Sequence, residues 1–141
     1  MKTTSKILLL ALVTIGYGCS KTSYDTTPQL VPMGSFSGNF TKIHLNSKTQ
    51  IIDTSKAIIT LEISNTGLFK ITGDTLKIHA GSHGMATLYS GYIQFIDSTA
   101  TVINPPKIHL NGIYQYYYDG SIFQLGASND TLKVLYDLKK S

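Results

Sequence analysis

The sequence predicts an all-β domain, and three observations support this fold class. Threonine, isoleucine and tyrosine are abundant, whereas arginine and tryptophan are absent and glutamate occurs once; β-branched and aromatic residues favour strands over helices. Short segments alternate apolar and polar residues with a period of two, as half-buried strands do. Turn-forming Gly, Asn and Asp residues separate these segments at regular intervals. No segment has a convincing helical pattern.

The first 18 residues have the layout of a secretory signal peptide. Lys2 and Lys6 precede a short apolar run that ends in small residues at Gly18. This run is too short to cross a bilayer, which takes about 20 apolar residues. Residues 15–19 (I-G-Y-G-C) resemble the lipobox of bacterial lipoproteins, in which the signal is cut before a cysteine that becomes lipidated. The resemblance implies lipid attachment at Cys19; an ordinary secreted protein with a cysteine near its cleavage site is the alternative.

Composition divides the chain into three parts and argues against nucleic-acid binding and thiol chemistry. We expect a lipoprotein signal peptide at 1–18, a lipidated N-terminus and flexible tether at 19–33, and a β-barrel domain at 34–141. Without Lys2 and Lys6, ten lysines face eight acids, which is a net charge of +2. Weak charge without arginine argues against a nucleic-acid partner. Lipidation of the single cysteine leaves no thiol for a disulfide, a metal or a nucleophile.

The expected elements follow in chain order. The first half predicts a strand from Gly34 to Phe40, a polar turn at 46–54, a strand at 59–63, a hairpin turn at 65–67 and a strand resuming at 69–71. A turn at 73–74 leads to a strand with Leu76, Ile78 and Ala80 on one side. A loop at 81–84 then precedes a strand at 88–96 that is apolar on both faces.

The second half continues the same pattern. A short strand at 100–103 is stopped by Pro105 and Pro106, because proline has no amide to donate to a ladder. Even-numbered residues from 108 to 118 share one face of the next strand, and Asp119-Gly120 is a two-residue hairpin turn. Strands at 121–125 and 131–138 complete the set, with Leu132, Val134, Tyr136 and Leu138 facing inward. Eight or nine sequential strands predict an antiparallel up-and-down β-barrel of about eight strands, with a two-sheet β-sandwich as the alternative.

Two segments resemble small lipocalin-like (calycin-type) lipoproteins of gut-type Gram-negative bacteria. Gly38-Asn39-Phe40 is similar to the G-x-W start of the first lipocalin strand, with Phe in place of Trp. Residues 110–120, followed by 132–139, resemble the closing hairpin of these proteins. The resemblance implies an eight-stranded barrel and a small apolar ligand, without identifying that ligand.

Inward-facing aromatic and apolar residues are the candidate ligand site. Tyrosines that face a barrel lumen can stack on a sugar or a planar ligand. Tyrosine is also common in strands that bind no ligand, because it has a high strand propensity. Tyr117 has the opposite parity and is expected at the surface. The predicted lumen residues are Phe40, Leu61, Phe69, Tyr114, Tyr116 and Tyr136.

The histidines and acids do not suggest a catalytic or metal site. His79 and His83 are four residues apart and share a face only in a helix, whereas nearby glycines indicate a strand entering a loop. His109 alternates with Leu110 and is expected on the solvent face. Most aspartates precede Ser, Thr or Gly, where they stabilise turns. No hydrolase elbow, phosphate loop or dinucleotide fingerprint occurs, so we expect no enzyme activity, no metal and no cofactor.

Four Asp-Ser/Thr turns resemble the acceptor for O-linked glycans that some Gram-negative anaerobes attach to exported proteins. An exposed turn is accessible to a transferase, although plain turn chemistry explains the same residues. The acceptor hydroxyls are those of Thr26, Thr75, Ser98 and Thr131.

Two functional classes remain open from the sequence. The first is a membrane-anchored binding module that holds a small apolar or glycan ligand. The second is a non-enzymatic interaction or inhibitor module, with a filled core, that contacts an envelope protein through its loops. The segment after Cys19 lacks an acidic cluster that would indicate surface export, so we expect an outer-membrane lipoprotein that faces the periplasm.

Overall fold

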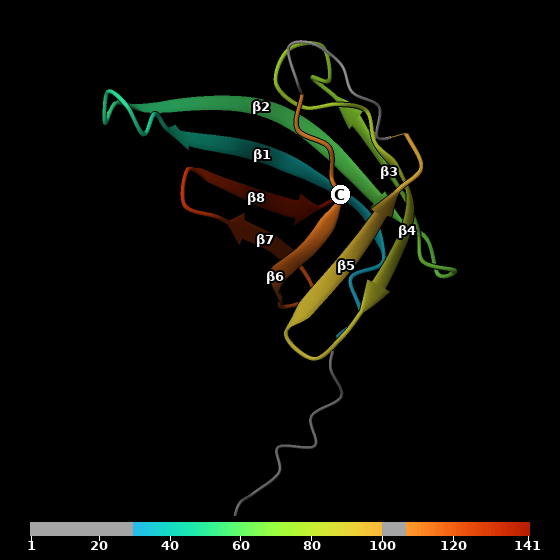
Figure 1. Ribbon diagram of the computed structural model, residues 1–141. Coiled ribbons are helices and arrows are strands. Elements are labelled where there is room, and N and C mark those ends of the chain that lie inside the picture. The colour runs from blue at the N-terminus through green and yellow to red at the C-terminus, as the bar shows by residue number, and fades with distance from the viewer. Residues whose placement is uncertain (1–29, 100–106) are drawn as a thin grey trace, which may run out of the picture.

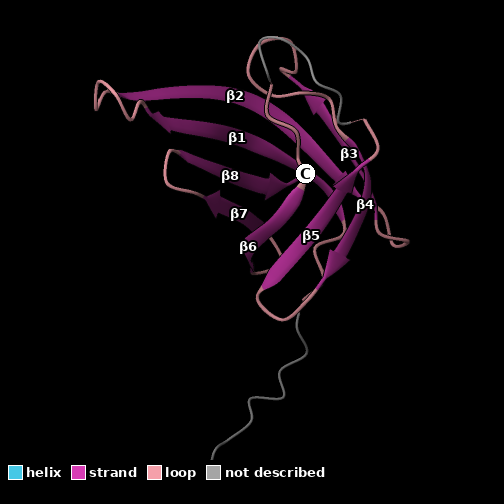
Figure 2. Ribbon diagram, in the orientation of Figure 1, coloured by secondary structure: helices cyan, strands magenta, loops and turns pink. Residues whose placement is uncertain are grey.

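The computed structural model describes residues 30–99 and 107–141. All regular secondary structure in these ranges is β-strand (Figures 1 and 2). The strands are β1 (Gly34–Leu45), β2 (Ile52–Ile63), β3 (Leu68–Gly73), β4 (His83–Leu88), β5 (Tyr92–Asp97), β6 (Gly112–Tyr118), β7 (Ile122–Ser128) and β8 (Leu132–Lys140). The predicted strand at 100–103 and the proline stop lie outside the described residues.

The eight strands form a closed antiparallel up-and-down barrel. Each strand pairs with the next, and β1 also pairs with β8, from Phe36 opposite Lys140 to His44 opposite Leu132. Because β1 pairs with β8, neither the first nor the last strand is left as an open edge strand of the kind that promotes edge-to-edge association. The predicted barrel is therefore confirmed, and the sandwich alternative is wrong.

The β1–β2 hairpin has the longest pairing in the barrel. Its register runs from Gly34 opposite Ile63 to Leu45 opposite Ile52, and its far end extends beyond the neighbouring strands in Figure 1. The predicted polar turn at 46–54 is too long, because residues 52–54 belong to β2. Gly38 lets β1 approach β8 closely, since a Cβ at this position would lie 2.2 Å from the backbone oxygen of Asp137.

Two of the predicted strands are wrong. Residues 74–82 form a loop in which Leu76 is 81% exposed, and their one ladder contact with other described residues is a parallel bridge between His79 and Ile108. The predicted strand at 88–96 is the end of β4, a turn and β5, because Gly91 adopts a φ of 81° that continuous strands do not use. β4 also begins at His83, inside the predicted loop.

The two ends of the barrel carry different connections. Short turns at 64–67, 89–91 and 119–121 lie at one end, which we call the turn end; the chain enters β1 there, after the buried Pro32. The other end, which we call the loop end, carries the connections 46–51, 74–82, 98–111 and 129–131. Three of the four connections at the loop end are longer than any turn at the turn end, whereas the β7–β8 connection at 129–131 is as short as those turns.

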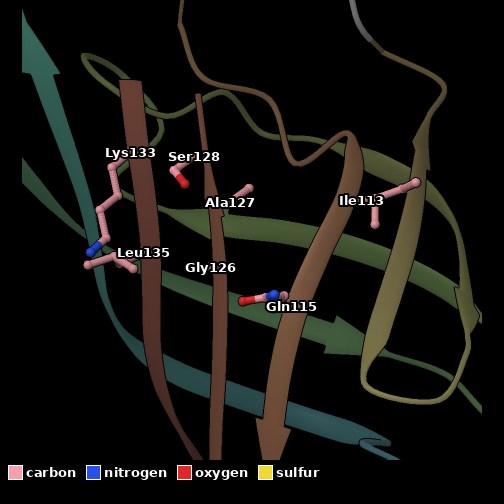
Figure 3. A pocket seen from close by; sticks show the side chains of 7 residues that line it. All are labelled: Ile113, Gln115, Gly126, Ala127, Ser128, Lys133 and Leu135. Carbon is pink, nitrogen blue, oxygen red and sulfur yellow. The ribbon is translucent and has the colours of Figure 1, made fainter. Parts of the chain in front are cut away.

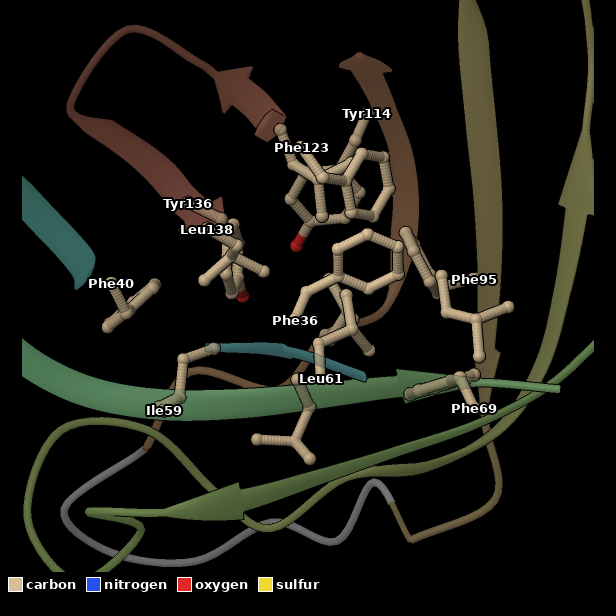
Figure 4. Close-up of a cluster of buried hydrophobic side chains, with 14 of the residues drawn as sticks. Phe36, Phe40, Ile59, Leu61, Phe69, Phe95, Tyr114, Phe123, Tyr136 and Leu138 are labelled. Carbon is tan, nitrogen blue, oxygen red and sulfur yellow. The ribbon is translucent and has the colours of Figure 1, made fainter. Parts of the chain in front are cut away.

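Aromatic side chains occupy the barrel interior (Figure 4). Phe36 and Phe123 have ring centroids 5.1 Å apart, and Phe69 and Phe95 have centroids 5.0 Å apart. Tilted and edge-to-face geometry of this kind is favourable between aromatic rings. Burial of each large apolar side chain contributes roughly 1.5–3 kcal/mol, so this cluster supplies much of the driving force for folding.

Candidate functional site

The pairing of β6 changes along its length and opens a seam in the barrel wall. β6 pairs with β5 from Gly112 to Gln115 and with β7 from Gln115 to Tyr118. Near the loop end, the described residues 112–114 therefore have no ladder partners on β7. We call this stretch between β6 and β7 the seam.

A cavity of about 350 Å³ lies at the loop end of the seam. Small-molecule sites begin at about 300 Å³, so this cavity, which we call the seam cavity, is large enough for a small ligand. Its apolar lining is Ile108, Tyr114, Ala127, Leu132 and Val134, and its polar lining is Lys107, His109, Asn111, Ser128 and Asn129.

A separate hollow of about 520 Å³, which we call the outer groove, crosses β6, β7 and β8 (Figure 3). It shares Ala127 and Ser128 with the seam cavity, and its lining includes Lys133 and the exposed Ile113. The seam cavity differs from it by containing Tyr114, an inward-facing aromatic, and His109. We therefore take the seam cavity as the candidate site.

A hydrogen bond between the side chains of Asp97 and His109 lies beside the seam cavity. Nδ1 of His109 lies 2.6 Å from Oδ2 of Asp97. Oδ1 of Asp97 accepts hydrogen bonds from the amides of His83 and Thr99 and from the Thr99 hydroxyl. Burial alone raises the pKa of Asp97, but the hydrogen bonds from Thr99, His109 and His83 outweigh it and hold the pKa below its ordinary value.

The position of His109 corrects a prediction from the sequence. Its side chain is 14% exposed and paired, not directed to solvent. The alternation that suggested a solvent-facing position does not apply, because β6 begins only at Gly112. Nε2 of His109 is buried and has no hydrogen-bond partner among the described residues. Ser128 lines the same cavity, but no hydrogen bond joins it to His109 in the described part of the chain.

His79 is buried inside the barrel. In the sequence it stands out only as a candidate metal ligand. Nδ1 donates to the carbonyl of Ala80, so Nε2 accepts a hydrogen bond from the Tyr136 hydroxyl at 2.8 Å. Burial lowers the pKa of His79 to about 4. His83 is exposed at the start of β4, and the described residues contain no group of three His, Cys, Asp or Glu side chains that could hold a metal.

The six predicted lumen residues all face inward. Five of them are buried and Tyr116 is partly buried. Burial raises the pKa of both Tyr114 and Tyr136, whose side chains hydrogen-bond to each other. Only Tyr114 among the six lines the seam cavity. Tyr117 is 56% exposed, which confirms its predicted surface position.

The predicted modification sites lie in different surroundings. Ser98 is exposed directly after β5, whereas Thr75 and Thr131 are partly buried in connections at the loop end. Thr26 and Cys19 lie outside the described residues. The glycan predictions and the lipidation prediction therefore stay predictions.

Comparisons with known proteins do not assign a family. A scan against protein-family models found no match, and searches of curated proteins and of solved structures also found none. In the described ranges, no helix has the length and apolar character needed to span a membrane. The closed eight-stranded antiparallel barrel is compatible with a lipocalin-like fold.

Proposed function

We propose that this chain is a lipid-anchored, lipocalin-like binding module of the cell envelope that takes a small apolar or glycan ligand at the seam cavity. One observation carries the proposal. A cavity with apolar and polar lining residues reaches the inward-facing Tyr114, at a stretch of β6 that has no ladder partner on β7. This combination of an apolar surface with a few polar groups is typical of small-molecule sites.

The seam cavity suits a ligand better than the centre of the barrel does. Phe36, Phe123 and their aromatic neighbours already pack against one another at the centre. A ligand there would have to displace these rings and forfeit their packing. Tyr114 needs no such displacement, because it lines the cavity directly.

The expected anchor agrees with the position of the cavity. The chain enters the barrel at the turn end, and the cavity lies at the loop end. An anchor at Cys19 is followed by residues 20–29, which span at most about 35 Å when extended. The turn end would then be nearer the outer membrane, and the seam cavity would open toward the periplasm.

A fluorescent probe can test the proposal. N-phenyl-1-naphthylamine is neutral and apolar, and its fluorescence rises when it leaves water. We expect saturable binding to the full chain and loss of binding in Ser128→Trp, which blocks the cavity from an exposed strand end. Thr54→Trp, at an exposed position on β2, should bind like the parent chain. Equal binding by all three chains would contradict the proposed site.

A row of exposed apolar residues favours interaction with an envelope protein as a second candidate function. Leu68 lies opposite Met85, and Met85 lies opposite Ile96, so the three side chains cross β3, β4 and β5 on the outer wall. A photo-crosslinking residue at Met85 should then capture one discrete envelope protein in cells, whereas the same residue at Lys56 on β2 should not. Identical patterns at both positions would contradict this function.

A further inference from the structure

We infer that the seam cavity selects a small amphipathic molecule with a carboxylate group, an inference that rests on the proposed binding function. The polar rim of the cavity presents hydrogen-bond donors. No acidic side chain is among the described residues that line it. Carboxylates are pure acceptors when ionised, so they match a rim of this kind.

The two asparagines of the rim expose donors because their oxygens are already used. Oδ1 of Asn111 accepts the backbone N–H of Asp97 at 3.1 Å. Oδ1 of Asn129 accepts the backbone N–H groups of Thr131 and Leu132, at 3.1 and 2.8 Å. An amide whose oxygen is held by backbone N–H groups turns its NH₂ group toward the remaining space. Both side chains therefore offer N–H groups.

Lys107 adds a positive charge to the same rim. Its Nζ donates to the backbone carbonyl of Thr75 at 3.0 Å. An ammonium group has three hydrogens, so two remain for a ligand. The bond to Thr75 also holds the flexible side chain at the cavity, which reduces the entropy lost when a ligand binds.

His109 supplies a ring nitrogen that lacks a partner. Asp97 holds Nδ1, whereas Nε2 is buried without a hydrogen bond from the described residues. Buried polar atoms without partners are rare in folded proteins. A ligand carboxylate that accepts a hydrogen bond from Nε2 would give this nitrogen the partner that it lacks. The ring would then lie between the Asp97 carboxylate and the ligand carboxylate.

The charges near the cavity and its apolar lining also fit an amphipathic carboxylate. Asp97 is engaged by His109, and Asp130 is exposed in the adjacent β7–β8 turn, outside the cavity lining. Lys107 and His109 thus face no carboxylate within the cavity itself. Tyr114, Leu132 and Val134 provide an apolar surface for the remainder of the ligand. The site fits one acidic head and a short apolar body.

Calorimetric titration of the full chain with octanoate and octanol tests this inference. The two probes have the same chain length and differ in the head group. We expect octanoate to bind at least ten-fold more tightly than octanol. Lys107→Met and His109→Asn should each reduce octanoate affinity about five-fold or more and narrow the difference in affinity between octanoate and octanol. Lys133→Met, which removes an equal charge from the outer groove, should bind both probes like the parent chain.

The other outcomes separate this inference from the proposed function. If octanol binds as tightly as octanoate, the cavity binds apolar molecules and the carboxylate inference is wrong. If octanoate affinity is unchanged in both Lys107→Met and His109→Asn, the charged rim does not recognise the head group and the inference is again wrong. If neither probe nor N-phenyl-1-naphthylamine binds, the proposed function fails as well.

Discussion

The Tyr136 hydroxyl donates a hydrogen bond to Nε2 of His79 across the barrel interior, over 2.8 Å. The direction of the bond follows from Nδ1, whose hydrogen is donated to the carbonyl of Ala80. His79 belongs to the 74–82 connection and Tyr136 belongs to β8. This single bond therefore ties a loop at the loop end to the opposite wall of the barrel.

Replacing Tyr136 with phenylalanine should destabilise the barrel by about 1–3 kcal/mol. The ring and its packing against Phe40, with centroids 5.0 Å apart, are retained. Nε2 of His79 loses its donor while it stays buried, and Tyr114 loses its hydrogen bond to the same hydroxyl. Urea unfolding measures the change in the free energy of unfolding. Tyr117→Phe at the exposed surface is the matched control and should change it by less than about 0.5 kcal/mol. Equal effects in the two variants would contradict the role of this buried hydroxyl.

Stability should fall when the pH drops from about 6.5 to about 4. The folded protein holds the pKa of His79 at about 4, below its ordinary value of 6.5, because of burial. The unfolded chain therefore binds the proton more readily, and the stability that is complete above pH 6.5 is lost as the pH approaches 4. This difference in pKa corresponds to about 3 kcal/mol. Urea unfolding at pH 7, 5.5 and 4 measures it.

The groups around His79 indicate the control for this pH dependence. Tyr136 and Tyr114 are uncharged in this range, and burial raises their pKa values further. His109 and Asp97 act on the ring through space in opposite directions. Asp97 has a lowered pKa, so the stability that it provides is lost only below its ordinary value of 3.8. His79→Gln should flatten the profile between pH 7 and 4, and an unchanged profile would contradict the assignment.

The alternation of apolar residues predicted β2, β3 and β8 well because each has one face in the core and one in solvent. Ile59, Leu61 and Phe69 are buried as predicted. Alternation failed at 74–82, where Leu76 is exposed in a loop that forms a single-residue bridge with Ile108. It also failed at 88–96, because Gly91 turns the chain between β4 and β5, and Tyr89 and Tyr92 stack across that turn.

The candidate site depends on contacts that no local pattern contains. His79 and Tyr136 are 57 residues apart, and Asp97 and His109 are 12 residues apart. The seam arises because β6 exchanges one neighbour for the other at Gln115. Only barrel closure brings these elements together. The sequence pattern predicted that Tyr114 and Tyr136 face inward, but no pattern in it predicted the hydrogen-bond donors of the polar rim.

Replacing Gly84 with alanine should destabilise the barrel by about 3 kcal/mol or more. A Cβ at this position would lie within 1.9 Å of the backbone oxygen of Ile96 on the paired strand β5, and a backbone atom cannot rotate away. Gly126→Ala is the matched control, because its Cβ would meet only the Leu135 side chain at an ordinary 3.5 Å. That variant should change stability by about 1 kcal/mol or less. Thermal unfolding of both variants decides the comparison.

Intact-mass spectrometry of the natively produced chain tests the glycan prediction. Ser98 is the exposed acceptor among the described ones, so we expect Ser98→Ala to remove one glycan mass. Thr131→Ala, at a partly buried position, should remove less or none. A parent mass equal to polypeptide plus lipid would show that the Asp-Ser/Thr turns serve only to shape the backbone.

Replacing Cys19 with serine should abolish acylation of the protein. The lipobox-like segment 15–19 predicts that Cys19 carries the acyl chains, and two or more chains hold a protein stably on a bilayer. The resemblance also places the signal cut directly before this cysteine, so we expect Cys19→Ser to keep its apolar signal, and membrane fractionation would not separate the two chains. Metabolic labelling with an alkyne-tagged fatty acid should therefore mark the parent chain and leave Cys19→Ser unlabelled. Equal labelling of both chains would contradict lipidation at Cys19.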